Sequence, residues 1–510
     1  MYDDWEPPSQ LLGDVARSGD AEMARESDIM SETDRPERKI AVIGGGFSGS
    51  LLALKLTARR PDWLITLIDP AVRPGRGLAY GACAPYHLLN VPAHRMEVGL
   101  APGFQAWLQG SGKDLDDALD ESGGDLADAF LPRRLLGDYL QARLAGAPPS
   151  INGHGLRRVR GEAVGVLEGP GRGVRLFDGR EIEADIVILA TGNLPPKAPL
   201  PADSWLQDHP AFIPDPWAKG ALSGLDPEAQ VLLLGTGLTM VDIALRLAEE
   251  GQTGPMLAIS RRGLAPTAHQ SGGAWAPFLT PMLPASPLTL CRAIRQAAAQ
   301  ASRENLPWQR VMDAVRPSIA QVWQSWSEAQ KRQFLRHLRP RWDVHRHRMA
   351  PRVAARLDGL MESGALTVMA GRLRNWTRQG DQVSATLFRR GGAGSMAIRA
   401  GSVINCTGPR SDLQGLAVPL FSDLSRRGLI LPDQLGLGLE SDDCAVLDHR
   451  GKASSWLYAV GPLTRPALWE ITAVPEIAAQ LDRLSLALSR TEAPATSGLA
   501  ETFVDMGAGI

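Results

Sequence analysis

One glycine-rich turn, GGGFSG at residues 44–49, constrains the fold of this chain more than any other segment. A short apolar run typical of a buried strand precedes the turn, and a pattern typical of a helix follows it. In this order Gly44 permits the tight turn, Gly46 lets a pyrophosphate approach the backbone, and Gly49 lets the helix pack close to the strand. The segment therefore predicts a dinucleotide-binding βαβ unit.

An acidic residue strengthens this prediction. Asp69 ends the next expected strand, residues 64–69, and its carboxylate is suited to accept hydrogen bonds from ribose hydroxyls. The start of the helix supplies free N–H groups and a partial positive charge for phosphates. The residues expected in this first site are Gly44, Gly46, Phe47, Ser48, Gly49 and Asp69.

A second, weaker fingerprint follows the expected strand at residues 231–234. Its pattern is Gly235-x-Gly237-x-x-Met240, and methionine in place of the third glycine sets helix and strand slightly further apart. The next strand ends in Ser260-Arg261-Arg262 rather than in an acid. Serine and arginines favour a 2′-phosphate, so we expect NADPH rather than NADH, unless the arginines pair with carboxylates elsewhere. The expected contacts are Gly235, Gly237, Leu238, Thr239, Ser260, Arg261 and Arg262.

The order of the segments assigns FAD to the first site. The last expected strand, residues 456–460, ends at Gly461, and the last expected helix, residues 468–489, follows it. Both are expected to return to the first unit, a nested order typical of flavoproteins with two dinucleotide-binding domains. Two strands that end in Thr191-Gly192 and Thr407-Gly408 resemble the crossings between domains in such proteins, so Thr191, Gly192, Gly408 and Gly461 join the expected cofactor contacts.

These patterns predict an α/β fold with two Rossmann-like dinucleotide-binding domains, β-meanders and a helical insertion. The expected boundaries are a disordered tail at residues 1–38, the first part of the FAD domain at 39–200, the NAD(P)H domain at 201–400 with an insertion at about 275–360, the rest of the FAD domain at 401–490, and a flexible tail at 491–510.

Composition excludes several other classes. The 510 residues carry a net charge of -2, which gives no argument for a nucleic-acid or membrane partner. Four cysteines stand far apart, without a CxxC pair, so a zinc site, a disulfide framework and a flavin disulfide reductase are all disfavoured. No apolar run is long enough for a membrane span, and the acidic N-terminus does not resemble a signal peptide, so we expect the cytoplasm.

Several further motifs resemble one bacterial family, the FAD/NAD(P)-binding flavoproteins that begin with a VIGGGFSG turn. The resemblance covers about residues 39–485. The matching segments are 42–49, 75–80 (GRGLAY), 87–93 (HLLNVPA), 132–133, 137–140, 235–242 (GTGLTMVD), 260–264, 345–351 (HRHRMAP) and 469–476 (WEITAVPE).

The resemblance implies an activity. Some members of this family are flavin monooxygenases, including amino-acid N-hydroxylases and a urate hydroxylase, and their plan is similar to that of flavin-containing monooxygenases. We therefore expect a monooxygenase that takes a hydride from NADPH and uses O2, through a flavin C4a-hydroperoxide, to hydroxylate a small polar substrate. Two alternatives stay open: a flavin reductase that passes electrons to another acceptor, and a non-catalytic, redox-sensing protein.

The candidate catalytic residues lie in two segments. Asn90 is placed near the flavin ring by the loop at 88–92, although a turn-forming role is equally compatible with it, and Leu89 is an expected cofactor contact. His345 and Arg346 belong to the densest basic run, residues 339–348, which suits an anionic substrate, a cofactor phosphate or a structural network. The spacing of its histidines does not suit a metal.

Three other features have both a functional and a structural interpretation. Arg133 suits either a cofactor phosphate or a salt bridge, and Glu470 is expected near the start of the last helix, where it would favour the helix dipole. The tryptophans around the basic run are interpreted as core packing rather than as stacking platforms; they are Trp308, Trp323, Trp326 and Trp342.

Overall fold

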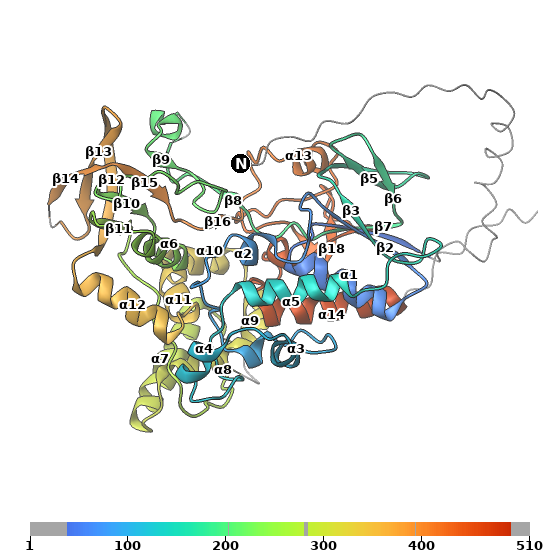
Figure 1. Ribbon diagram of the computed structural model, residues 1–510, viewed down its shortest axis with the longest axis horizontal. Helices are drawn as coiled ribbons and strands as arrows, with labels where there is room; N and C mark the ends of the chain where they lie inside the picture. Colours follow the sequence, from blue (N-terminus) through green and yellow to red (C-terminus); the bar gives the residue numbers. More distant parts are fainter. Residues whose placement is uncertain (1–37, 202, 280–283, 393, 491–510) are drawn as a thin grey trace, which may run out of the picture.

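The computed structural model describes residues 38–201, 203–279, 284–392 and 394–490. Two seven-stranded sheets form separate lobes, shown on the right and left of Figure 1. The tails predicted at 1–38 and 491–510 lie almost entirely outside the described residues. No helix in the described ranges combines the length and the apolar character that crossing a membrane requires.

The first sheet has the strand order β17-β18-β19-β7-β1-β2-β3. Its three central strands, β7, β1 and β2, are parallel and nearly continuously apolar, as burial on both faces requires. The strands are β1 (Lys39–Ile43), β2 (Leu64–Asp69), β3 (Gly155–Arg160), β7 (Ile186–Leu189), β17 (Ser441–Asp442), β18 (Ala445–Leu447) and β19 (Ala453–Ala459). Since β19 pairs with β7, the C-terminal part of the chain does return to the first unit, as predicted.

Helices α1 (Phe47–Arg59), α5 (Arg134–Ala145) and α14 (Val474–Arg490) pack on one face of this sheet (Figure 1). The other face is covered by a meander and by α13 (Pro419–Arg426). The meander consists of β4 (Ala163–Leu167), β5 (Gly173–Leu176) and β6 (Glu181–Glu183). Smaller helices precede α5, namely α2 (Gly77–Gly81), η2 (Ala93–Met96), α3 (Phe104–Gly110) and α4 (Asp116–Glu121).

The second sheet has the order β14-β13-β12-β11-β10-β15-β9. Its strands are β9 (Phe212–Ile213), β10 (Val231–Leu234), β11 (Met256–Ser260), β12 (Leu366–Gln379), β13 (Gln382–Arg389), β14 (Ser395–Ala400) and β15 (Ser402–Asn405). Helices α6 (Leu238–Glu249) and α12 (Pro351–Glu362) share one core with this sheet, and η3 (Trp205–Asp208) contributes to the core on the other face. Both Rossmann-like units and both meanders are therefore present.

Two short strands connect the lobes. β8 (Leu194–Pro196) follows Thr191-Gly192, β16 (Pro409–Arg410) follows Thr407-Gly408, and the two strands pair with each other. The predicted crossings are thus confirmed. The predicted domain boundary at 400/401 lies too early in the sequence. Strand β15 pairs with β10 and so belongs to the second sheet, not to the first.

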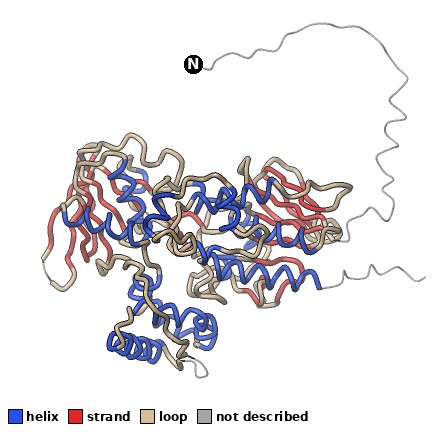
Figure 2. The backbone as a smooth tube through the Cα atoms, turned by 60° about the horizontal axis from the view of Figure 1, so that its bottom comes forward, coloured by secondary structure: helices blue, strands red, loops and turns tan. Residues whose placement is uncertain are grey.

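The insertion is a group of helices that projects from the body of the molecule in Figure 2. Its members are α7 (Pro287–Arg303), α8 (Trp308–Val315), η4 (Arg316–Ser318), α9 (Ile319–Ser325), α10 (Glu328–His337) and α11 (Arg339–Arg346). Trp323, Trp326 and Trp342 are buried in its core together with Trp469, and Trp308 packs against them. The interpretation of these tryptophans as core packing is confirmed.

Candidate functional site

The first glycine turn tolerates no side chain at two of its positions. Gly44 has φ +104°, and a Cβ there would lie 2.4 Å from the carbonyl oxygen of Ala190. A Cβ on Gly49 would lie 1.8 Å from the carbonyl oxygen of Gly44. The turn, the end of β7 and the start of α1 are thus in direct backbone contact, which is the close helix–strand packing expected from the sequence.

Asp69 is directed back at this turn. Its Oδ2 accepts a hydrogen bond from the N–H of Gly45 at 2.5 Å, and its Oδ1 accepts one from the N–H of Ala71 at 2.8 Å. An ionised carboxylate has about four acceptor positions, so capacity for ribose hydroxyls is left. The backbone bonds hold the carboxylate at the end of β2, beside the turn.

The C-terminal return reaches the same place. The backbone of Gly461, at φ +69°, lies so close to α1 that a Cβ would come within 2.9 Å of Ser48 Oγ. The buried side chain of Gln480 accepts from the N–H of Gly461 at 2.8 Å and donates to Thr464 Oγ1 at 2.8 Å. Helix α14 thereby fixes the end of β19 against the start of α1.

The residues around this turn fit a bound pyrophosphate. Helix α1 has neither a side-chain cap nor an acid in its first turn, so its first N–H groups are available to an anion. The buried hydroxyl of Thr191 has no hydrogen-bond partner in the described structure. A Cβ on Gly192 would meet nothing within 4 Å. Phe47, the first residue of α1, packs edge-on against Tyr80.

The second turn repeats this design with a wider opening. Gly235 has φ +120°, and a Cβ there would lie 2.4 Å from the carbonyl oxygen of Cys406. A Cβ on Gly237 would meet nothing within 4 Å, so space above this turn is open. Leu238 and Thr239 begin α6, and Gly408 faces Thr239, whose Oγ1 is 4.0 Å from the position of a Cβ on Gly408. Met240, at the departure from the third glycine, is buried in the core.

Ser260, Arg261 and Arg262, at the end of β11, make different contacts. Ser260 Oγ accepts from the N–H of Gly263 and from Thr236 Oγ1, both at 2.9 Å, and so shapes the turn. Arg262 donates to the carbonyls of His337 and Arg336 at the end of α10. Arg261 is exposed and has no ion pair or side-chain hydrogen bond within the described ranges. Of the three, Arg261 is therefore the side chain most available to a phosphate.

Arg133 forms the salt bridge that the sequence left as one of two interpretations. Its NH1 lies 2.9 Å from Asp242 Oδ2, on α6 of the second lobe, and its NH2 donates to the carbonyl of Leu88 at 3.1 Å. His87 Nε2 lies 3.1 Å from the carbonyl of Asp242, and burial lowers the pKa of this histidine. Asp242 was not recognised in the sequence as a partner, because its role depends on a contact between distant segments.

We expect the Asp242→Asn variant to be destabilised by about 3–5 kcal/mol, because the largely buried Arg133 would lose its counter-charge. The double variant Arg133→Met/Asp242→Leu removes both charges and should recover most of that loss. Thermal unfolding of the FAD-loaded protein measures both effects. Equal stabilities of Asp242→Asn and wild type would show that this pair does not hold the lobes together.

The loop proposed to lie beside the flavin is held between the two lobes. Leu89 is buried, and its N–H bonds to the carbonyl of Leu131. The carbonyl of Asn90 lies 2.6 Å from His269 Nε2, on the segment that follows β11. Burial, with a smaller contribution from the charge of Arg348, lowers the pKa of His269 to about 4. A carbonyl only accepts, so neutral His269 must carry its proton on Nε2.

The two candidates in the basic run lie in different surroundings. His345 is exposed, with Nδ1 2.7 Å from the carbonyl of Arg341 and its ring against Trp308. Arg346 is buried, with Nε 3.0 Å from Glu470 Oε2. The expectation for Glu470 is wrong: α14 begins only at Val474, and Glu470 is a buried acceptor for Trp342 Nε1 at 2.7 Å.

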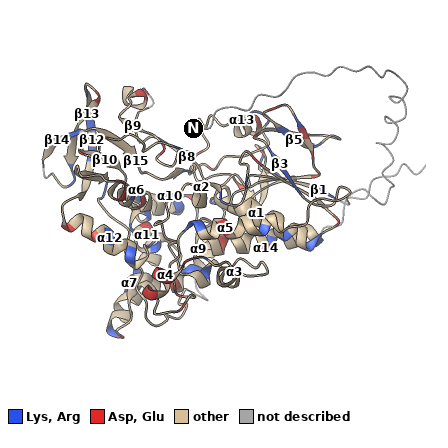
Figure 3. Ribbon diagram, viewed as in Figure 1, with Lys and Arg blue, Asp and Glu red and all other residues tan. Residues whose placement is uncertain are grey.

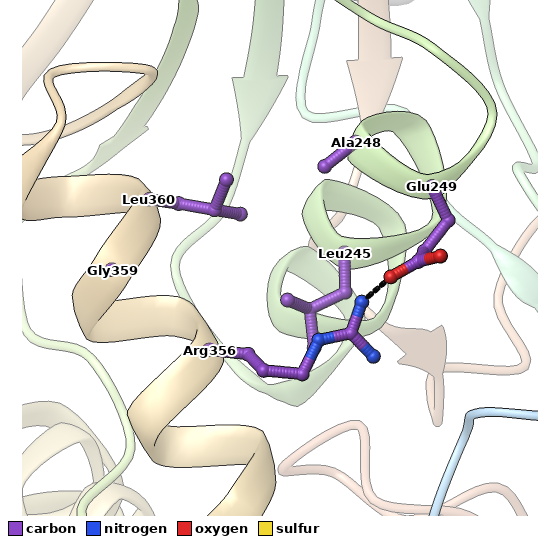
Figure 4. Close-up of a pocket in the computed structure, with 6 residues that line it drawn as sticks. All are labelled: Leu245, Ala248, Glu249, Arg356, Gly359 and Leu360. Atoms are coloured by element: carbon purple, nitrogen blue, oxygen red, sulfur yellow. Dashed lines mark ion pairs between the residues drawn. The ribbon is translucent and has the colours of Figure 1, made fainter.

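Two remaining features bear on chemistry. The four cysteines are free, and within the described part of the chain no group of three or more His, Cys, Asp or Glu residues is placed to hold a metal ion. Figure 4 shows a hollow of ≈ 340 Å³ between α6 and α12, crossed by the ion pair of Arg356 and Glu249. It lies on the outer side of α6, away from both glycine turns, and we assign it no role.

Comparison with known proteins agrees with this geometry. Residues 41–194 match the model of the FAD-NAD(P)-binding family, so this part of the chain is an FAD-NAD(P)-binding domain. The sequence matches no curated protein significantly.

Solved structures show the same fold over nearly the whole chain. The FAD-bound cadaverine monooxygenase of Erwinia amylovora has 13% identity and a TM-score of 0.60, over 90% of this chain and 99% of that one. The L-lysine 6-monooxygenase of Pseudomonas syringae has 16% identity and a TM-score of 0.58, over 89% and 99%. The ornithine N-hydroxylase of Kutzneria, solved with reduced FAD, NADP+ and L-ornithine, has 16% identity and a TM-score of 0.57, over 88% and 99%. The expected two-domain flavoenzyme fold is confirmed.

Proposed function

We propose that this FAD- and NAD(P)-binding protein is an NADPH-dependent monooxygenase that hydroxylates a small polar substrate. The observation that carries the proposal is the pairing of two open glycine turns, each against the carboxyl end of a neighbouring strand, in one chain. The solved structures of similar fold, three of which are named for the hydroxylation or oxygenation of amines, favour oxygenation over the alternatives.

The first turn would hold FAD. Gly44, Gly46 and Gly49 keep the backbone accessible, Asp69 would bind the ribose, and Ser48 with Gly461 would border the pyrophosphate. When bound and reduced, FAD supplies the activation of O2 and the transfer of one oxygen atom. The protein's own task is to place the substrate and to exclude water. Leu89, Asn90 and the loop held by Arg133 are proposed for that task.

The second turn would hold NADPH. Gly237 leaves room for the pyrophosphate at the start of α6, where Leu238 and Thr239 present their N–H groups. Arg261 would bind the 2′-phosphate, while Ser260 and Arg262 hold the turn in shape. His345 is kept as a catalytic candidate on position alone, and Arg346 is treated below. The four free cysteines suit a reducing compartment, so we propose the cytoplasm.

We expect the Arg261→Ala variant to lose preference for NADPH. A charge-assisted hydrogen bond to a phosphate contributes about 1.5–3 kcal/mol, so kcat/KM for NADPH should fall about 10- to 100-fold while that for NADH stays unchanged. Steady-state reduction of the flavin with each nucleotide measures the ratio. The exposed Arg292, on α7, gives the control variant Arg292→Ala. Equal decreases in kcat/KM for NADPH and NADH would exclude a contact between Arg261 and the 2′-phosphate.

The activity itself is tested with isotopically labelled O2. FAD-loaded protein is incubated with NADPH and a panel of amino acids, polyamines and purines, and the products are analysed by mass. We expect a product that carries one labelled oxygen atom and forms in proportion to the NADPH consumed. NADPH oxidation that yields only H2O2 across the whole panel, together with fast reduction of an artificial electron acceptor, would favour the reductase.

A further inference from the structure

A group of arginines, two of them buried and three partly buried, lies where the helical insertion meets the FAD domain. We call it the arginine cluster, and it consists of Arg95, Arg310, Arg316, Arg346 and Arg348. Arg310 and Arg316 come from the consecutive α8 and η4, Arg346 ends α11, and Arg348 follows it. Arg95 comes from η2, which is far from these segments in the sequence. Figure 3 shows basic residues on α10 and α11 near this region. The sequence identified only part of the group, as the basic run that ends at Arg348.

The carboxylates facing the cluster are too few to neutralise it. Asp313 is shared by Arg348 and Arg310, the latter at 2.9 Å. Glu476 is shared by Arg316 and Arg346, the latter at 3.6 Å. Glu470 pairs with Arg346 alone, at 3.0 Å. Within the described residues, three carboxylates therefore face five guanidinium groups, which leaves two positive charges over.

Arg95 is the member without a partner. Its side chain has no ion pair or hydrogen bond within the residues that the structure describes. Burial lowers the pKa of Arg95, the charges of Arg316, Arg310 and Arg346 lower it further, and Asp313 opposes them. Arg95 thus lies within electrostatic range of the other arginines, and its charge is the least compensated.

Several polar atoms deep in the cluster also lack hydrogen-bond partners. The donors among them that also face no carboxylate are Nε of Arg310 and Nε of Arg348. Nε and NH2 of Arg346 make no hydrogen bond, but they lie 3.0 Å from Glu470 Oε2 and 3.6 Å from Glu476 Oε1. Arg348 is 2% exposed and Arg346 is 7% exposed, so bulk water does not satisfy them. Burying charged donors without partners is destabilising, and a bound anion would accept hydrogen bonds from them.

The cluster adjoins the loop proposed to lie beside the flavin. Arg95 belongs to η2, which follows Asn90 and Pro92 directly, and its N–H bonds to the carbonyl of Pro92 at 3.0 Å. Across the cluster, Arg348 NH1 donates to the carbonyl of Gln309, whose Nε2 lies 3.5 Å from the carbonyl of Ala268, next to His269. The same histidine bonds to Asn90. The NADPH phosphate site at Arg261 lies on a different turn.

We propose that the arginine cluster binds a carboxylate group of the substrate, with Arg95 as the side chain that contacts it. This inference rests on the proposed function, because it makes the substrate an organic acid held beside the flavin loop. The cluster already pairs with carboxylates in this way: Arg316 contacts both oxygens of Glu476 through Nε and NH2. A planar guanidinium suits such two-point contact with a carboxylate.

The test uses malonate as the probe anion. FAD-loaded protein is first saturated with NADP+, so that the nucleotide phosphate site is filled, and malonate is then added at constant ionic strength. Binding is followed by the visible absorbance of the flavin and by the melting temperature. We expect saturable binding to wild type, about 10- to 100-fold weaker binding to Arg95→Ala, and unchanged binding to the control Arg292→Ala.

Three outcomes would overturn the proposal: no binding of malonate to wild type, equal binding to Arg95→Ala, or tighter binding of inorganic phosphate than of malonate. Arg95→Lys keeps the charge without the planar fork and should recover part of the affinity, which separates a ligand contact from a folding defect. None of these readouts needs NADPH oxidation or oxygen transfer. Failure of the proposed function would instead appear in the labelled-O2 experiment.

Discussion

The Gly49→Val variant should be isolated without flavin. A side chain at this position begins with a Cβ that would lie 1.8 Å from the carbonyl oxygen of Gly44. The oxygen belongs to the backbone, and the backbone of α1 fixes the position of the Cβ, so neither atom can rotate away. Helix α1 would have to move away from β1, which takes its N–H groups away from the pyrophosphate. Overpacking typically costs about 1–3 kcal/mol and can cost more. A loss of about 3 kcal/mol corresponds to a decrease in FAD affinity on the order of 100-fold.

The flavin content of the purified protein, measured from its visible absorbance against protein concentration, checks this result. Gly359→Ala is the matched control, because Gly359 lies within α12 and a Cβ there meets nothing within 4 Å. That variant should be as stable as wild type or more so, by up to about 1 kcal/mol. Full flavin occupancy in Gly49→Val would contradict an FAD site at this turn.

The Gly237→Val variant should fold, retain FAD and lose productive binding of NADPH. Here a Cβ meets nothing within 4 Å, so the protein itself has room for the side chain. The occupied space is the space that a pyrophosphate needs to reach the start of α6. We expect the dissociation constant of NADP+ to rise on the order of 100-fold, as the loss of about 3 kcal/mol implies.

Titration with NADP+, followed through the flavin spectrum, measures the NADP+ affinity of Gly237→Val. The flavin content of the same variant shows whether the FAD site at the Gly44 turn is intact. The contrast between the two glycines makes the pair of variants informative. Packing within the protein requires glycine at position 49. At position 237 the protein itself has room for a side chain, so glycine is required there only for the binding of a nucleotide. Unchanged NADP+ affinity in Gly237→Val would show that the nucleotide does not bind at this turn.

Local pattern was sufficient to predict the parts of the fold that depend on neighbours in the sequence. Both glycine turns, the strands before them and the helix after the first turn, α1, fall where periodicity and turn chemistry placed them, because an apolar strand followed by glycines has few other structures available. The two Thr-Gly crossings also appear as predicted. These are the features that we propose to position the two cofactors.

The structure differs from the sequence-based predictions where contacts between distant segments determine the position of a strand or a side chain. Whether β15 joins the first or the second sheet depends on its pairing with β10, which nothing in residues 402–405 encodes. Glu470 resembles a residue at a helix start, but its position is decided by Arg346 and Trp342 of the insertion. The arginine cluster could not be recognised for the same reason, since Arg95 comes within electrostatic range of Arg316 only in the folded chain.

We expect the helical insertion to determine the substrate selectivity of the candidate site. The glycine turns explain how a chain of this kind holds two dinucleotides, and they would serve many substrates equally well. Selectivity must come from side chains near the flavin loop. We propose that in this chain those side chains are Asn90, His269 and the arginine cluster, and the last of these carries more positive charge than the carboxylates of the described residues neutralise.

Anaerobic mixing of FAD-loaded protein with NADPH tests most directly whether the Gly235 turn delivers electrons to a flavin at the Gly44 turn. We expect the visible absorbance of the flavin to bleach, faster with NADPH than with NADH, and to return when O2 is admitted. A flavin that stays oxidised at saturating NADPH would contradict an NADPH-dependent function for this protein.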